Sequence, residues 1–190
     1  MINTVLSFLQ QDISRYIDVA TANSPDQSIV VLSAIANDSG KYAIGDNKLG
    51  LALINIEEDK IFRSQIPDRR EVAGQFVQFQ PDIKIDLTIL IAARFGQYDE
   101  ALKNIAKVIL YFQTRPVFTN TDYPDLKNVQ KIVPELQSLG YEQLNQVWAY
   151  VGAKYLPSVV YKLRLLVMQE ETVDSLAPAV QHITANMHSR

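Results

Sequence analysis

The sequence predicts a mixed α/β domain of the α+β type, in which a central, largely antiparallel sheet is packed by about three helices. Three segments carry apolar residues at three- and four-residue steps, and several short segments rich in β-branched residues alternate apolar with polar side chains. Gly, Pro, Asn and Asp separate these segments. With 190 residues, of which 47% are hydrophobic, the chain can bury a core of its own. We assign residues 1–170 to this domain and residues 171–190 to a C-terminal tail.

The start of the chain predicts one helix followed by two strands. Apolar residues from Ile2 to Ala20 form a single stripe with helical spacing, over about five turns. The β-branched run 28–35 predicts a buried strand, and residues 49–56 predict a second one. Turn residues at 37–40 separate the two strands.

Residues 60–82 show no sustained period. A stretch of this length without clear structure is unusual inside a compact domain, and such segments are often functional or mobile. Within it, the alternating residues 75–79 predict an extra edge strand.

The second half of the chain alternates strands with helices. Residues 83–91 alternate cleanly, with Lys84, Asp86 and Thr88 on the polar face. A helix opening at Asp99 carries an apolar stripe composed of Leu102, Ile105, Ala106, Ile109 and Leu110. The remaining predicted elements are a loop with a brief extended piece at 117–126, a strand at 129–136 with Pro134 indicating an edge or the strand end, a helix at 142–151 and a strand at 159–167.

Composition argues against several classes of function. The chain has no cysteine, so disulfides, thiolate nucleophiles and cysteine metal sites are excluded. Its only histidines, His182 and His188, lie in the tail, so a histidine base or triad in the domain body is excluded as well. The net charge of -3 argues against a nucleic-acid binder. The chain begins without the basic and long apolar run of a signal peptide, and no segment has the length of a bilayer span.

Four segments, in order and spacing, resemble the tail terminators, or cap proteins, of phage-tail-like contractile injection systems. More narrowly, they are similar to the N-terminal domain of terminators of extracellular, antifeeding-prophage-type particles. The last segment is the most distinctive. The segments are Met1-Ile-Asn-Thr-Val-Leu; Leu49-Gly-Leu-Ala-Leu-Ile-Asn-Ile-Glu-Glu58 with Arg63; Ile85-Asp-Leu-Thr-Ile-Leu-Ile91 leading to Leu110-Tyr-Phe-Gln113 and Pro116-Val-Phe118; and Glu142-Gln-Leu-Asn-Gln-Val-Trp148 with Lys154-Tyr-Leu-Pro-Ser-Val-Val-Tyr-Lys-Leu-Arg164.

The resemblance implies a tail-terminator-like fold and a structural role. Six copies are expected to form a ring on the last layer of the inner tube, which ends tube growth and joins the tube to the sheath. No enzymatic reaction, cofactor, metal, nucleic acid or membrane contact is expected. The protein is expected in the cytoplasm during assembly, as part of a particle that is released or membrane-anchored. Open sheet edges are compatible with this role, since a neighbouring chain can extend a sheet by backbone hydrogen bonds.

Two groups of residues are candidates for subunit contacts. Lys162 and Arg164 lie on the non-core face of the last predicted strand, whose other interpretation is a solvated face. The second group belongs to the 60–82 segment, which we expect to become ordered on assembly. Its members are Arg63, Arg69, Arg70, Phe76 and Phe79.

One alternative is a small-ligand binding module, or an enzyme without histidine or cysteine chemistry. It rests on the 60–82 segment and on an aromatic cluster of Trp148, Tyr150, Tyr155 and Tyr161, most of which we expect in the core. The acidic run 57–59 could bind a hard cation, but adjacent acids at strand ends are far more often solvated.

Overall fold

The computed structural model describes residues 1–21, 28–59, 68–72, 75–79, 83–126, 129–167 and 176–177. Three helices and nine strands lie in this part of the chain. In chain order they are α1 (Ile2–Thr21), β1 (Val30–Leu32), β2 (Lys48–Glu58), β3 (Asp68–Val72), β4 (Gln75–Phe79), β5 (Ile83–Arg94), α2 (Tyr98–Thr114), β6 (Phe118–Thr119), β7 (Val129–Leu136), α3 (Tyr141–Val151), β8 (Ser158–Val167) and β9 (Leu176–Ala177).

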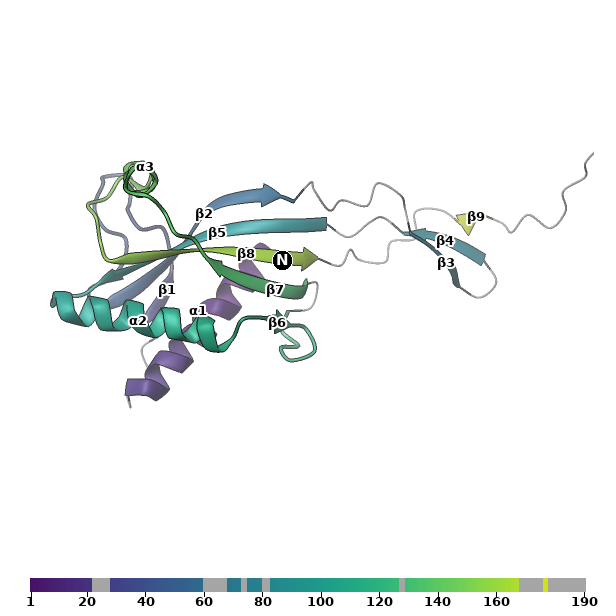
Figure 1. Ribbon diagram of the computed structural model, residues 1–190, viewed down its shortest axis with the longest axis horizontal. Coiled ribbons are helices and arrows are strands. Elements are labelled where there is room, and N and C mark those ends of the chain that lie inside the picture. Colours follow the sequence, from purple (N-terminus) through teal and green to yellow (C-terminus); the bar gives the residue numbers. More distant parts are fainter. Residues whose placement is uncertain are drawn as a thin grey trace, which may run out of the picture.

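A six-stranded sheet forms the centre of the molecule, in the order β1-β2-β5-β8-β7-β6 (Figure 1). All of its pairings are antiparallel except that of β1 with β2. The predicted α+β class with a largely antiparallel sheet is therefore confirmed. None of the helices in the described ranges is long and apolar enough to span a bilayer.

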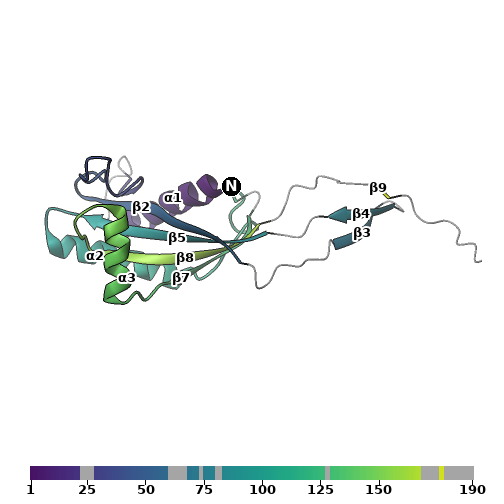
Figure 2. The ribbon, with the colours of Figure 1, turned by 90° about the horizontal axis from the view of Figure 1, so that it is seen from above.

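The two faces of the sheet are covered differently, as Figures 1 and 2 show. Helices α1 and α2 pack on one face, where Leu87, Ile89 and Ile91 of β5 are fully buried. Helix α3 packs Trp148 on the other face, against Leu90 of the same strand. Because successive side chains of a strand point to opposite faces, β5 contributes to both cores. Helix α3 covers only part of its face.

A buried polar network joins α1 to α2. Tyr111 donates a hydrogen bond of 2.7 Å to Asp12 Oδ2, and Arg115 Nη1 donates one of 3.0 Å to the same oxygen. The Arg115 guanidinium also lies over the rings of Tyr16 and Tyr111. Burial, followed by the hydrogen bond to Asp12, raises the pKa of Tyr111 above its ordinary range. The buried Asp12 carboxylate is thus paired with a cation and a hydroxyl donor.

The 60–82 segment differs from its prediction. Residues 75–79 do form a strand, but β4 is the middle strand of a separate sheet, β3-β4-β9, and not an edge of the main sheet. The sequence did not predict β3. In Figures 1 and 2 this small sheet is drawn beyond the end of the main sheet where β8 ends and β5 begins. The boundary between domain and tail near residue 170 stays a prediction, although β9 pairs with β4.

The buried side of α2 also differs from the predicted apolar stripe. Of the five predicted members only Ile105 is buried, whereas Leu102 and Leu110 are about half exposed, at 47% and 50%. The sheet covers the neighbouring side of the helix, which carries Ala101, Asn104, Ile105, Val108, Tyr111 and Phe112. Apolar residues surround more than half of α2, so periodicity alone did not identify the side that packs.

Candidate functional site

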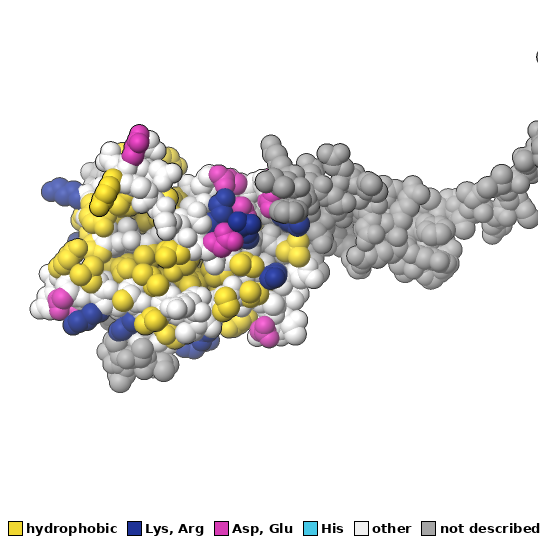
Figure 3. Space-filling view, in the orientation of Figure 1, with side chains coloured by type: hydrophobic (Ala, Val, Ile, Leu, Met, Phe, Trp, Pro, Cys, Tyr) yellow, Lys and Arg dark blue, Asp and Glu magenta, His cyan; other side chains and the backbone are white. Residues whose placement is uncertain are grey.

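The part of the α3-side face that α3 leaves uncovered carries charged side chains from four strands. On β8, Tyr161, Leu163 and Leu165 point into the core beneath α1 and α2, so Lys162 and Arg164 point the opposite way, as predicted. Figure 3 shows basic and acidic side chains gathered beside α3. We call this area the charged face and define it by Glu57, Asp86, Glu135, Lys162 and Arg164.

Lys162 is the centre of this face. Its Nζ lies 3.0 Å from Glu57 Oε2 on β2 and 3.2 Å from Asp86 Oδ2 on β5. The hydrogen bonds to Glu57 and Asp86 raise the pKa of Lys162 above its ordinary value. The side chain of Asp86 is only 13% exposed, so Lys162 neutralises a carboxylate that is largely withdrawn from water.

A β-bulge in β2 places Glu57 on the charged face. Leu53 pairs with Ile89, but the next paired residue on β2 is Asn55, opposite Thr88, so Ile54 is an extra residue. One extra residue exchanges the faces of all later side chains. Without it, Ile56 rather than Glu57 would lie beside Lys162, and the carboxylate would point to the other face.

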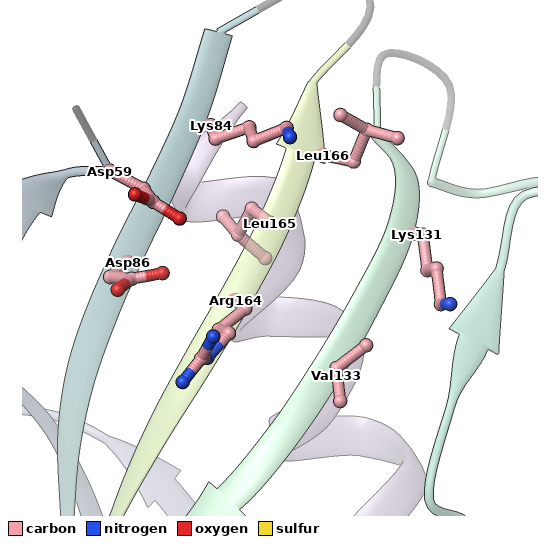
Figure 4. A pocket seen from close by; sticks show the side chains of 8 residues that line it. All are labelled: Asp59, Lys84, Asp86, Lys131, Val133, Arg164, Leu165 and Leu166. Atoms are coloured by element: carbon pink, nitrogen blue, oxygen red, sulfur yellow. The ribbon is translucent and has the colours of Figure 1, made fainter. Parts of the chain in front are cut away.

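Arg164 lies at the edge of a hollow of about 210 Å³ on the charged face (Figure 4). Its Nη2 is 3.0 Å from Glu135 Oε2 on β7, and both side chains are substantially exposed. In Figure 4, Asp59 and Asp86 lie on one side of Arg164, and Lys131 and Val133 on the other. Typical small-ligand pockets hold roughly 300–1,000 Å³. The hollow is smaller than that and mixes acidic with basic groups, so the ligand-module alternative is not favoured.

The charged side chains of this face are arranged as ion pairs. In the described ranges, no group of three or more His, Asp or Glu side chains is placed to hold a metal ion. Its acids and bases form ion pairs between neighbouring strands, which fix the strands and present a polar surface. Such a surface suits contact with another protein, and an interface role for Lys162 and Arg164 stays a proposal.

The other candidate residues are not brought into a described site. Arg63 lies outside the described residues. The backbone of β3 places Arg69 opposite Gln78 and Arg70 opposite Val77, and that of β4 places Phe79 opposite Asp68. The side chains of these strands, including that of Phe76, also lie outside the description. The expectation that this segment contributes to assembly therefore stays a prediction.

The aromatic cluster is divided between core and surface. Trp148 and Tyr161 are buried, whereas Tyr150 and Tyr155 are exposed, so the expectation that most of the cluster lies in the core holds for only two of its four members. Tyr155 contacts Trp148 edge to face, with ring centroids 5.5 Å apart. The four rings therefore form no common platform for a ligand.

Two open strand edges in the described sheet lack full sets of backbone donors. On β7, Gln137 N donates to Val160 O of β8, so alternation turns the backbone of Pro134 outward, where proline has no N–H to offer. On β2, past its pairing with β1, the N–H of Ile56 is bonded to Asn55 Oδ1 at 2.9 Å. Both features hinder strand addition at these edges.

Comparison with known proteins identifies the relatives of this chain. A family model described as the Pvc16 N-terminal domain matches residues 2–182. No curated protein matches the chain. Among solved structures, one similar chain comes from the sheath/tube terminator of an extracellular contractile injection system, PVC, in the extended state. It has a TM-score of 0.64 and 14% identity, over 94% of this chain and 63% of that chain.

A second similar structure is the tube-terminating cap of the anti-feeding prophage, AFP. It has a TM-score of 0.58 and 14% identity, over 85% of this chain and 55% of that chain. The present chain thus spans less than two thirds of either structure. At this identity the two likenesses establish a shared fold.

Proposed function

The chain belongs to the Pvc16 N-terminal domain family, and from that membership we propose that it is a terminator of a contractile injection system. In this role it binds the distal end of the inner tube and the end of the sheath, stops tube growth and couples the two. The observation that carries the proposal is the family match over residues 2–182, which includes the whole six-stranded sheet and all three helices. The shared fold with two solved terminators supports it.

The partners in this proposal are the tube protein, the sheath protein and further copies of the chain in a hexameric ring. Ring closure needs heterologous contacts, in which two different surfaces of the chain meet. The charged face supplies one polar surface of suitable character, because its ion pairs join strands β2, β5, β8 and β7 into a fixed arrangement. The proposal requires neither catalysis nor a cofactor. The protein would act in the cytoplasm during assembly and remain in a particle that is released or membrane-anchored.

The test is deletion of the gene in the organism that makes the particle, followed by electron microscopy of purified particles. We expect tubes of irregular length and sheaths detached from tube ends, with normal particles restored by the wild-type gene. Tube and sheath lengths equal to those of the wild type would refute the proposal.

A second test uses purified protein mixed with tube assemblies. Negative-stain images should show extra density at one end of each tube and none along its side. Protein distributed along the tube wall, or absent from the tubes, would contradict a terminator role.

A further inference from the structure

Helix α3 is anchored to the sheet by a single buried side chain. Trp148 is 6% exposed and is the one buried residue of this helix, whereas α2 buries a row of residues from Ala101 to Phe112. The other apolar residues of α3 that pack toward the sheet are only partly buried. In the part of the chain that the structure describes, no side chain of α3 forms a hydrogen bond or an ion pair with the sheet. The contact between α3 and the sheet is therefore small and apolar.

The anchor itself is incomplete. The indole Nε1 of Trp148 is buried and has no hydrogen-bond partner among the described protein groups. A buried donor without a protein partner opposes burial, because the same N–H bonds to water once it is exposed. The ring of Trp148 contacts Tyr155 edge to face at 5.5 Å, but Tyr155 follows α3 in the same connection between β7 and β8 and can move with it. Burial of the indole ring thus holds α3 in place against a polar group that favours release.

The segment that carries α3 is tied to the sheet at its two ends. Gln137 N donates a hydrogen bond of 2.9 Å to Val160 O, and Ala93 N donates one of 2.9 Å to Pro157 O. Residues 138–156 lie between these two points and contribute no strand to the sheet. Movement of α3 therefore requires no strand pair to break. Glycines at both ends of the helix, Gly140 and Gly152, can absorb the change in backbone direction.

The sheet beneath α3 is apolar and continues into the charged face. Figures 1 and 2 show α3 lying across the strand direction on this side of the sheet. On β8, Val160 shares its face with Lys162 and Arg164, because alternate residues of a strand point the same way. Removal of α3 would thus join an apolar patch to the charged face. The covered patch consists of Ala52, Leu90, Ala92 and Val160, which are buried in one cluster with Trp148.

We propose that α3 is a lid, which opens as a unit about Gly140 and Gly152 while the six-stranded sheet stays paired. Opening extends the charged face by the covered patch, and closure withholds that patch from water and from partners. The small apolar contact, the unpartnered indole N–H and the two fixed ends of the segment together make opening a local event. The lid is a property of the free chain, so the inference goes beyond the proposed function and does not rest on it.

Native-state thiol labelling tests the lid, because the chain has no cysteine of its own. Ala92 and Ala93 are neighbours on β5, are 0% and 1% exposed, and belong to the α3-side core and the α1-side core, respectively. The variants Ala92→Cys and Ala93→Cys therefore make the same change on opposite faces of one strand. In the absence of urea, Ala92→Cys should react with a soluble thiol reagent at least about 100-fold faster, because local opening needs less free energy than global unfolding. Equal rates would overturn the proposal, since both thiols would then be reached by global unfolding.

The fluorescence of the unmodified protein provides the second measurement, since Trp148 is the only tryptophan of the chain. As urea is raised, its emission should shift to the red and become accessible to acrylamide before most of the far-UV circular dichroism signal is lost. Separate transitions of this kind show that α3 leaves the sheet while the sheet remains folded. Coincident transitions of the two signals would show that α3 is released only when the whole domain unfolds, and would refute the lid.

Discussion

Replacing Lys162 by Met tests how much the ion pairs of the charged face stabilise the fold. Met keeps most of the apolar stem but removes the ammonium group, leaving Glu57 and Asp86 without their shared partner. The Asp86 carboxylate is 13% exposed, and losing a charge-assisted hydrogen bond there costs about 1.5 kcal/mol. The Glu57 carboxylate is 51% exposed, so that pair adds only about 0.5 kcal/mol.

The free energy of unfolding should therefore fall by about 2 kcal/mol, which for a chain of this size lowers the melting temperature by about 4–8 °C. Thermal and urea unfolding of the purified protein at neutral pH measure this change. The control is Lys154→Met, at an exposed position, which should change stability by less than about 0.5 kcal/mol. A melting temperature of Lys162→Met within about 1 °C of the wild type would show that the ion pairs contribute nothing to the fold.

The pH dependence gives a second check on the same reasoning. Glu57 and Asp86 raise the pKa of Lys162 above the ordinary lysine value of 10.5. The stabilisation is then fully present below that ordinary value and is lost as the pH rises through the raised pKa of the folded protein. The difference between wild type and Lys162→Met should thus be constant from neutral to mildly alkaline pH and shrink in strongly alkaline solution. A difference that shrinks already near neutral pH would contradict the assignment.

Three further predictions follow from the same contacts. Arg164→Gln removes only an exposed ion pair, so it should lower the free energy of unfolding by less than about 1 kcal/mol. If the charged face is an interface, the same variant should bind less well to tube ends. Unchanged binding would show that Arg164 faces solvent. Asp12→Ala should lower the free energy of unfolding by about 3 kcal/mol, because it leaves the buried Tyr111 hydroxyl unpaired, whereas Tyr111→Phe should lower it by about 1.5 kcal/mol. Urea unfolding of the two single variants and of the double variant should show strongly non-additive losses of stability. Additive losses would contradict a shared network. Pro134→Ala restores an outward N–H on β7 and should therefore increase concentration-dependent aggregation, measured by light scattering. The control is Pro116→Ala, which lies outside the strand. Equal aggregation of the two variants would show that Pro134 does not protect the edge.

The periodicity of the sequence predicted the elements of the main sheet well. Strand β5 alternates Ile and Leu with Lys, Asp and Thr over its first half, and this pattern requires one buried and one polar face. The placement of Lys162 and Arg164 opposite the core followed from the same alternation in β8. Pro134 indicated an edge position, and β7 is indeed left uncovered there past its short pairing with β6.

Three features depended on contacts between distant segments. Apolar residues lie on more than one side of α2, and the side that is buried is the one from which Tyr111 reaches Asp12 of α1, across 99 residues. The partner of Lys162 was decided by the bulge at Ile54, because a single extra residue reverses which side chains face it. The pairing of β4 with β9 joins segments about 100 residues apart, and no local pattern specifies it.

The sequence by itself thus determined the element types, the fold class and, through four ordered segments, the resemblance to terminators that the family match confirms. These properties are local or additive along the chain, so they can be read from spacing and order. Only the tertiary structure decided which surfaces remain exposed, because exposure depends on what every other segment covers. The exposed positions of Leu102 and Leu110 on α2 and the ion-paired charged face are both consequences of that distribution.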